Sequence, residues 1–310
     1  MLYRRQSSER RRALTDSLDL AAVAYDAAKD EIIDSVVYKK LSEMSYPGNE
    51  KFKDTLARLA DMEHDHYDFF RKYCPDRTIP ASNLMVNFVV MLRVLLGVTF
   101  AVRYLERNEA STIKKYREAA HLIPAADRAK LQQIIADEEE HEREFSEQFQ
   151  EPHIKYISFI VLGLADALVE IAGIHAGSLG IFNKTELAGL AGIVAGAAAS
   201  VAMASAAYAQ AKAGFKGSAA LSAVYTGISY FVTAVILATP YFLTQQMVNA
   251  LLTSLTLAVL LIAFITFFGS VISGSNFRKD FLEITSIMFG ATVALYVLGT
   301  AIRYFTGITI

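Results

Sequence analysis

Two short motifs of the same form carry side chains that could do chemistry. Glu63 and His66 form one Glu-x-x-His motif, and Glu138 and His141 form another. Residues three apart lie on one face of a helix, so each motif would direct a carboxylate and an imidazole to the same point. A carboxylate-rich ligand set with two imidazoles suits iron or manganese better than zinc or copper. The spacing therefore predicts a metal centre.

Three more glutamates complete the predicted ligand set. Glu31 lies in a helical stretch before the first motif, and Glu106 and Glu109 lie in one before the second. Four helices can hold a metal pair when two supply a glutamate and two supply a Glu-x-x-His motif. A solvated acidic helix would produce any single motif by chance, but the full set in this order favours a metal centre. The predicted ligands are Glu31, Glu63, His66, Glu106, Glu109, Glu138 and His141.

Apolar periodicity and helix-breaking residues predict the helices that position these ligands. Turn signals at Pro47, Pro75 and Pro124 separate four helical segments, which run over about residues 16–44, 49–73, 82–120 and 125–150. We expect an all-α fold that begins with a four-helix bundle over residues 16–151. The arginine-rich residues 1–15 are expected to form a flexible basic N-terminus.

One apolar stretch in the third segment, residues 84–102, has the composition of a membrane span. Arg93 lies at its centre, where a charge would be costly in lipid. A span here would also place the two halves of the ligand set on opposite sides of the membrane. We therefore expect a helix with a second apolar face that packs against a partner subunit or the membrane surface, with a true span as the alternative.

Charge divides the chain in two. Residues 1–155 hold 24 of the 30 Lys and Arg residues and 27 of the 32 Asp and Glu residues, which leaves 6 and 5 for the rest. The net charge of -2 argues against a nucleic-acid partner. The single cysteine, Cys74, excludes an internal disulfide and a four-cysteine metal centre. The C-terminal half, residues 152–310, has the composition of a membrane domain.

Five apolar runs in this half each approach the roughly 20 residues that cross a bilayer. They cover about residues 156–181, 187–211, 219–243, 248–273 and 281–305. Positive charge gathers in alternate loops, at Lys212 and Lys216 and at Arg278 and Lys279. The positive-inside rule then predicts a multi-pass protein of the cell (inner) membrane with a cytoplasmic N-terminal domain and the C-terminus outside.

Ionisable residues within these runs are candidates for a transport path. Asp166 and Glu170 lie one turn apart in the first run, where two carboxylates could hold protons or a divalent cation. His175 follows in the same run, and Met203 in the second run offers a soft thioether to Fe(II). Each has a bland alternative: the carboxylates could pair with another helix, the histidine could lie near the outer interface, and a lone methionine is usually packing.

Residues 16–150 resemble the rubrerythrin branch of the ferritin-like superfamily. The resemblance rests on Glu31 with Tyr38 and on three motifs, Glu63-x-x-His66, Glu106-x-x-Glu109 and Glu138-x-x-His141. It implies a di-iron centre (Fe2+/Fe3+, or Mn2+) that oxidises Fe(II) or reduces peroxide. It also implies that Glu109 and His66 exchange as ligands of one iron. Full rubrerythrins carry a four-cysteine iron centre as well, so a peroxidase cycle here would need an external reductant.

Residues 155–308 are similar to the vacuolar iron transporter family. Residues 163–168 follow its Gly-Leu-x-Asp-Gly-Leu pattern with Ala167 for the second glycine, and Met203 precedes a tyrosine as in its second span. Ile171 and Ala207 also depart from the family pattern, and these departures leave the ion path open. The resemblance implies a homodimer that exchanges Fe2+ for H+ and moves iron out of the cytosol.

The whole chain resembles prokaryotic membrane-bound ferritins, in which a rubrerythrin-like domain is fused to such a transporter. We therefore expect an iron exporter, for Fe2+ and possible Mn2+, that is proton-coupled and carries a cytoplasmic domain that captures, oxidises or senses iron. The alternative is a membrane-anchored ferroxidase or peroxide reductase whose spans are only an anchor. A third hypothesis is a sensor in which metal occupancy of the bundle opens the carrier.

Overall fold

The computed structural model describes residues 2–45, 50–80, 82–148 and 154–307, with side chains described from residue 20 and not for residues 50–51, 142–148 and 154. All regular structure in these ranges is helical, which confirms the all-α prediction. The chain divides into two compact units, Met1–Gln150 and Glu151–Ile310, and each is considered by itself.

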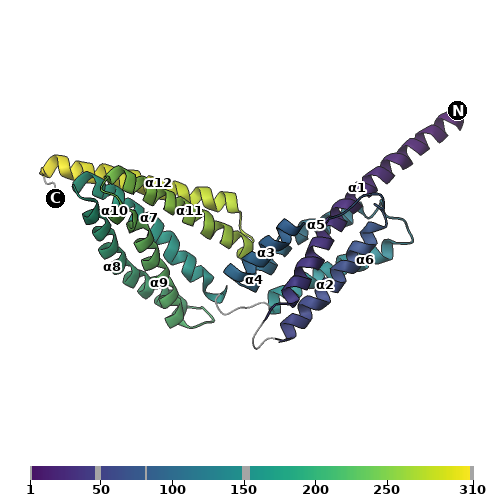
Figure 1. Ribbon diagram of the computed structural model, residues 1–310, viewed down its shortest axis with the longest axis horizontal. Coiled ribbons are helices and arrows are strands. Elements are labelled where there is room, and N and C mark those ends of the chain that lie inside the picture. The colour runs from purple at the N-terminus through teal and green to yellow at the C-terminus, as the bar shows by residue number, and fades with distance from the viewer. Residues whose placement is uncertain (1, 46–49, 81, 149–153, 308–310) are drawn as a thin grey trace. The chain divides into compact units, whose positions relative to one another are not determined.

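The first unit contains three long helices and one interrupted segment (Figure 1). The helices are α1 (Leu2–Ser42), α2 (Glu50–Arg71), α3 (Asn83–Leu96), α4 (Val98–Glu106), α5 (Glu109–Ala119) and α6 (Arg128–Gln148). Helix α1 begins at Leu2, well before residue 16 where the first segment was expected to start, so the backbone of the basic N-terminal segment after Met1 continues the helix. Helices α2 and α6 lie within the predicted segments.

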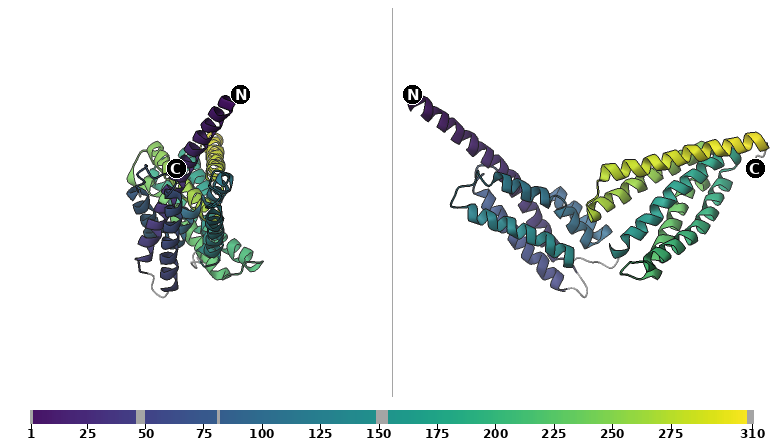
Figure 2. Two further views of the ribbon diagram at one scale, coloured as in Figure 1. Left: turned by 90° about the vertical axis from the view of Figure 1, so that its right-hand side faces the viewer. Right: turned by 180° about the vertical axis from the view of Figure 1, so that it is seen from behind.

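Apolar packing fixes the long helices around the predicted ligands. Ala24 and Ala28 on α1 join Phe69 and Phe70 on α2 and Ile134 on α6 in one buried cluster. Both views in Figure 2 show α1 and α2 lying side by side. These apolar residues recur at helical spacing, so each helix has an apolar stripe that packs in this cluster. Other positions on the same helices carry the polar residues of the motifs.

The third predicted segment is not one helix but three, so the prediction of a continuous helix over residues 82–120 is wrong. Gly97 separates α3 from α4 with φ of 91°, a left-handed conformation that glycine adopts without the steric cost of a Cβ atom. A second break at Arg107 and Asn108 separates α4 from α5. Apolar residues continue on both sides of Gly97, and the second break lies in a polar stretch without proline or glycine, so neither break was predicted.

Helix α3 has the two apolar faces that the sequence predicted. Val86, Val89 and Leu92 are buried within the unit, whereas Leu84 is 85% exposed and Leu95 is 67% exposed. The helix has 14 residues, fewer than the roughly 20 that a span needs. The break at Gly97 and this length tell against the alternative of a true span over residues 84–102.

The second unit contains five helical segments long and apolar enough to cross a membrane, as predicted. A short helix, η1 (Ile154–Tyr156), leads into the first, and the third comprises α9 and the one-turn α10. The helices are α7 (Ile157–Ile181), α8 (Thr185–Lys212), α9 (Ala219–Ala238), α10 (Pro240–Leu243), α11 (Met247–Ser273) and α12 (Phe277–Thr306).

Glycines bring α7 and α12 into backbone contact. A Cβ atom on Gly299 would collide with the carbonyl oxygen of Gly177, and one on Gly180 would lie 2.8 Å from the backbone of Gly299. Gly290, also on α12, has no neighbour within 4 Å of such a Cβ. Small residues allow apolar helices to associate through close van der Waals contact, so this contact is expected to stabilise the pair.

We expect Gly299→Ala to destabilise the second unit by about 1–3 kcal/mol, because the added methyl group forces two backbones apart. Gly290→Ala is the matched control and should be neutral or slightly stabilising, since it adds a methyl group to open space on the same helix. Thermal unfolding of the full chain in detergent measures both. Equal melting temperatures for the two variants would contradict the role given to the α7–α12 contact.

Candidate metal centre

Six of the seven predicted ligands meet inside the first unit. The structure forms two groups whose possible ligand atoms all lie within 4.8 Å of one another: Glu31, Glu63, His66 and Glu138 in one, and Glu109, Glu138 and His141 in the other. All six side chains are buried, with exposed fractions between 0 and 8%. Glu138 belongs to both groups, which is the arrangement that a carboxylate shared by two metal ions requires.

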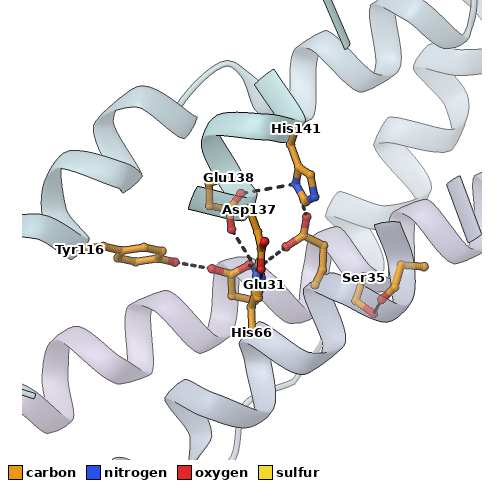
Figure 3. Close-up of polar contacts among 9 residues, drawn as sticks. Glu31, Ser35, His66, Tyr116, Asp137, Glu138 and His141 are labelled. Atoms are coloured by element: carbon orange, nitrogen blue, oxygen red, sulfur yellow. Dashed lines mark hydrogen bonds and ion pairs between the residues drawn. The ribbon is translucent and has the colours of Figure 1, made fainter. Parts of the chain in front are cut away.

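Two carboxylates each face both histidines (Figure 3). Glu63 places one oxygen 3.2 Å from Nδ1 of His66 and the other 3.2 Å from Nδ1 of His141. Glu138 repeats this pattern at 3.0 Å and 3.6 Å. The helices α2 and α6 therefore present their Glu-x-x-His motifs to each other, with each Nδ1 atom directed into the space between the two carboxylates.

Glu31 completes one side of the cluster. Its Oε2 atom lies 3.8 Å from Nδ1 of His66, and its Oε1 atom accepts a hydrogen bond from the hydroxyl of Tyr116 on α5 (Figure 3). Tyr116 lies seven residues after Glu109 in the sequence, but its hydrogen-bond partner is on α1. Burial and the Glu31 charge raise the pKa of Tyr116, so it stays a hydrogen-bond donor.

Glu106 and Glu109 lie on different helices because of the second break in the third segment. Glu109 is the first residue of α5, where the helix dipole favours a carboxylate. Glu106 is the last residue of α4 and is partly buried. It lines the cavity beside the cluster but lies outside both groups of possible ligands. The expectation of Glu106-x-x-Glu109 on one continuous helix is therefore wrong.

Both histidines are held in the protonated form when no metal is bound. Burial alone would lower the pKa of His66, but hydrogen bonds with Glu138, Glu31 and Glu63 outweigh it and raise the pKa to about 12. Burial likewise opposes protonation of His141, but Glu138 and Glu63 raise its pKa to about 10. At neutral pH each imidazolium therefore carries the charge that balances one of the shared carboxylates.

The carboxyl groups separate into two kinds. For Glu63 and Glu138, burial acts to raise the pKa, but hydrogen bonds from the two histidines outweigh it and lower the pKa. For Glu31, burial and then the charge of Glu138 raise the pKa well above its usual range. For Glu109, burial and then the neighbouring Glu106 carboxyl group raise the pKa. The metal-free cluster thus favours two carboxylates paired with two imidazolium ions.

This protonation pattern fits a pair of divalent cations. Two imidazolium protons, and up to two carboxyl protons from Glu31 and Glu109, occupy positions at which ligand atoms converge. If two divalent ions replaced them, four carboxylates would balance the four positive charges, and both imidazoles would be neutral ligands. Four carboxylates and two imidazoles are donors that iron and manganese favour. The residues therefore fit a di-metal centre.

One residue of this site was missed by the sequence analysis. Asp137 on α6 places Oδ2 3.5 Å from Nε2 of His66, on the side of the ring away from the cluster (Figure 3). A carboxylate in this position orients a metal-binding histidine and increases its basicity. The only sequence signal was an aspartate directly before the second Glu-x-x-His motif, and that signal cannot be told from the rest of the acidic run.

In the second unit, the two predicted transport carboxylates lie one turn apart on α7. Glu170 accepts a hydrogen bond of 2.5 Å from the hydroxyl of Tyr230 on α9. Asp166 and Glu170 are both partly buried, and Tyr230 is fully buried. Met203 on α8 packs against the apolar cluster that contains Tyr230. Sequence spacing could not reveal Tyr230, because its partner is about 60 residues earlier in the chain.

The fourth predicted path residue, His175, has a different environment. It is fully buried, and its ring lies 4.3 Å from that of Tyr241 on α10. A Cβ atom on Gly192 of α8 would collide with its Nε2 atom, so this side of the ring faces α8. Nine residues separate His175 from Asp166, which places them on opposite faces of α7. The structure therefore does not bring His175 together with the Asp166 carboxylate.

Comparison of the chain with protein-family models, with curated proteins and with solved structures found no match. The chemical argument for the site therefore rests on the residues and their geometry.

We expect metal affinity to rise with pH between about pH 6 and pH 8. Because the pKa values of metal-free His66 and His141 are about 12 and about 10, both rings are protonated throughout this range and must lose a proton to bind a metal. Calorimetric titration with Mn2+ in buffers of different ionisation enthalpy counts the protons released. His66→Asn should weaken binding, whereas His64→Asn, an exposed neighbour, should not. A pH-independent affinity would contradict the protonated metal-free state.

We expect Asp137→Asn to weaken metal binding by about tenfold, because the amide orients the ring of His66 less well than a carboxylate and does not increase its basicity. Asp65→Asn, an exposed acid on α2, is the matched control. The same Mn2+ titration measures both variants. An affinity of Asp137→Asn equal to that of the control would remove Asp137 from the site.

Proposed function

We propose that this protein is an iron exporter of the inner membrane that moves Fe2+, or Mn2+, out of the cytoplasm in exchange for protons. The observation that carries the proposal is the union of two features in one chain. A buried Glu and His cluster able to hold metal is followed by five apolar helices, and the first of these carries two carboxylates. A protein that only bound metal in its first unit would not need carboxylates within apolar helices, where they are costly.

In this proposal the first unit is a ferritin-like domain of the rubrerythrin type. Glu31, Glu63, His66, Glu109, Glu138 and His141 would hold the resident metal pair. A bound iron pair would supply one-electron redox chemistry toward Fe(II), oxygen or peroxide. The chain's own residues do the remaining work: Tyr116 keeps Glu31 in place, Asp137 orients His66, and the apolar cluster around Phe69 and Phe70 excludes water.

The transport path proposed for the second unit runs along α7. Asp166 and Glu170 would bind the cation and exchange it for protons, and Tyr230 would position Glu170 through its hydrogen bond. Met203 would add a soft ligand on α8. Because His175 faces α8 and Tyr241, its place in this path is the weakest of the four. Small residues on α7 and α12 allow the close packing that such a path needs.

The proposed orientation rests on the loops between the apolar helices. Lys212 and Lys216 flank the connection from α8 to α9, and Arg278 and Lys279 begin α12. Positive charge at these two connections favours the cytoplasmic side for both. The first unit would then be cytoplasmic and the C-terminus outside, so the metal centre would meet the reduced iron of the cytosol. A homodimer is part of this proposal through the resemblance to iron transporters.

We expect Asp166→Ala and Glu170→Gln to reduce Fe(II) flux to background while metal binding by the first unit is retained, because the two sites are separate. Full-length protein in proteoliposomes with a trapped pH dye and an iron indicator reports metal and proton movement together. Glu283→Gln, an exposed acid on α12, is the matched control and should transport normally. Wild-type flux in Asp166→Ala would overturn the assigned path, and metal flux without proton movement would overturn the exchange.

A second candidate function is a membrane-anchored ferroxidase or peroxide reductase, favoured by the fully buried cluster with Tyr116 beside Glu31. The same proteoliposomes separate the two functions. Fe(II) oxidation or peroxide consumption by full-length protein, with no metal flux, would identify the enzyme and leave the five helices as an anchor.

A further inference from the structure

A cavity of about 140 Å³ lies beside the metal cluster and has an unusual wall. Seven of its twelve lining residues are acidic, and none is a lysine, arginine or histidine. Five of the seven are glutamates already described at the centre. The other two, Asp30 and Asp34 on α1, belong to neither group of possible metal ligands. The ligand set therefore does not explain why these two carboxylates are present.

Glu109 supplies a second observation that points to a cation. Its side chain is 8% exposed and lines the cavity, and neither carboxylate oxygen has a hydrogen-bond partner among the residues with described side chains. A buried carboxyl group in such a position keeps its proton unless a positive charge comes close, because an unpaired carboxylate there is costly. A cation in the cavity in front of Glu109 would therefore be stabilised once that proton leaves.

Asp34 lines this cavity, and no contact among the described residues explains its presence by stabilisation of the fold. It has no hydrogen bond or ion pair to another residue in the described part of the chain. Burial and then the charges of four acidic groups, Glu63, Glu106, Glu31 and Asp30, raise the pKa of Asp34. Repulsion of this kind destabilises a fold, so a function in attracting cations accounts for Asp34 better than a function in packing.

Asp30 connects this cavity to the outside of the helix pair. A second cavity, of about 320 Å³, lies between α1 and α5 and shares Asp30 and Thr112 with the first. Asp30 is exposed, and Asp26, one turn earlier on α1, also lines the second cavity. Lys115 on α5 and Lys29 are the cations near Asp30. The acidic row thus leads from an exposed position on α1 to the buried ligands.

We propose that Asp30 and Asp34 form an acidic vestibule that captures hydrated divalent cations and passes them to the Glu and His cluster. This inference rests on the proposed metal centre and adds the route by which its metal arrives. The two carboxylates attract the cation and lower the cost of removing its water, but they do not remain as ligands of the final centre.

The test is the rate of cation binding by the full-length protein in detergent. Stopped-flow mixing with Co2+, followed by visible absorption, gives the association rate and the final spectrum. We expect Asp34→Asn and Asp30→Asn to slow association about tenfold at low ionic strength, with a weaker salt dependence than wild type. The spectrum and the stoichiometry at saturation should be unchanged. Glu43→Gln, an exposed acid directly after α1 and outside the residues that line the cavity, is the control and should bind at the wild-type rate.

The outcomes separate this inference from the proposed function. Wild-type association rates in both variants would overturn the vestibule and leave the metal centre standing. A changed saturation spectrum or stoichiometry in Asp34→Asn would make Asp34 a ligand of the centre and would also overturn the vestibule. Failure of the wild-type protein to bind Co2+ at all would overturn the metal centre itself. If Asp34→Asn does not fold, Asp30→Asn still tests the vestibule, because Asp30 is exposed and its substitution should leave the fold intact.

Discussion

The burial of four carboxyl groups around two imidazoles is the constraint on which the first unit depends. Buried carboxylates are costly unless protons, cations or hydrogen-bond donors balance them. Here Glu63 and Glu138 each form ion pairs with both protonated histidines, and Glu31 accepts a hydrogen bond from the hydroxyl of Tyr116. The metal-free cluster is therefore balanced by protons, and binding of a metal would exchange these protons for cations.

The same constraint accounts for the interrupted third segment. A single straight helix would carry its glutamates along one line, whereas the break after Glu106 makes Glu109 the first residue of α5. There the free backbone N–H groups and the helix dipole offset part of the cost of a buried carboxylate. Gly97 makes the earlier break possible because φ of 91° carries no steric penalty for glycine. The break at Arg107 and Asn108 thus places Glu109, whose carboxyl oxygens have no hydrogen-bond partner among the residues with described side chains.

Much of this arrangement could be predicted from spacing within single helices. The Glu-x-x-His motifs and the five apolar runs depend on local periodicity, and the structure has helices close to the predicted boundaries. Contacts between helices could not be predicted in this way. Tyr116 pairs with Glu31 across 85 residues, Tyr230 pairs with Glu170 across 60, and Asp137 was hidden in an acidic run. Periodicity also failed at the breaks, because apolar residues lie on both sides of Gly97 and the polar residues 106–109 contain no proline or glycine.

In both units, carboxylates that are removed from water need a hydrogen-bond donor or a cation nearby, but the two units supply these partners differently. In the first unit, histidines supply positive charge within 4 Å of the shared carboxylates. In the second unit, only one donor, the hydroxyl of Tyr230, meets Glu170, and no histidine or basic side chain pairs with either α7 carboxylate in the described residues. A carboxylate with so few partners is a candidate ligand for a cation. The absence of a permanent ion pair among the described residues leaves these carboxylates able to serve in the proposed path.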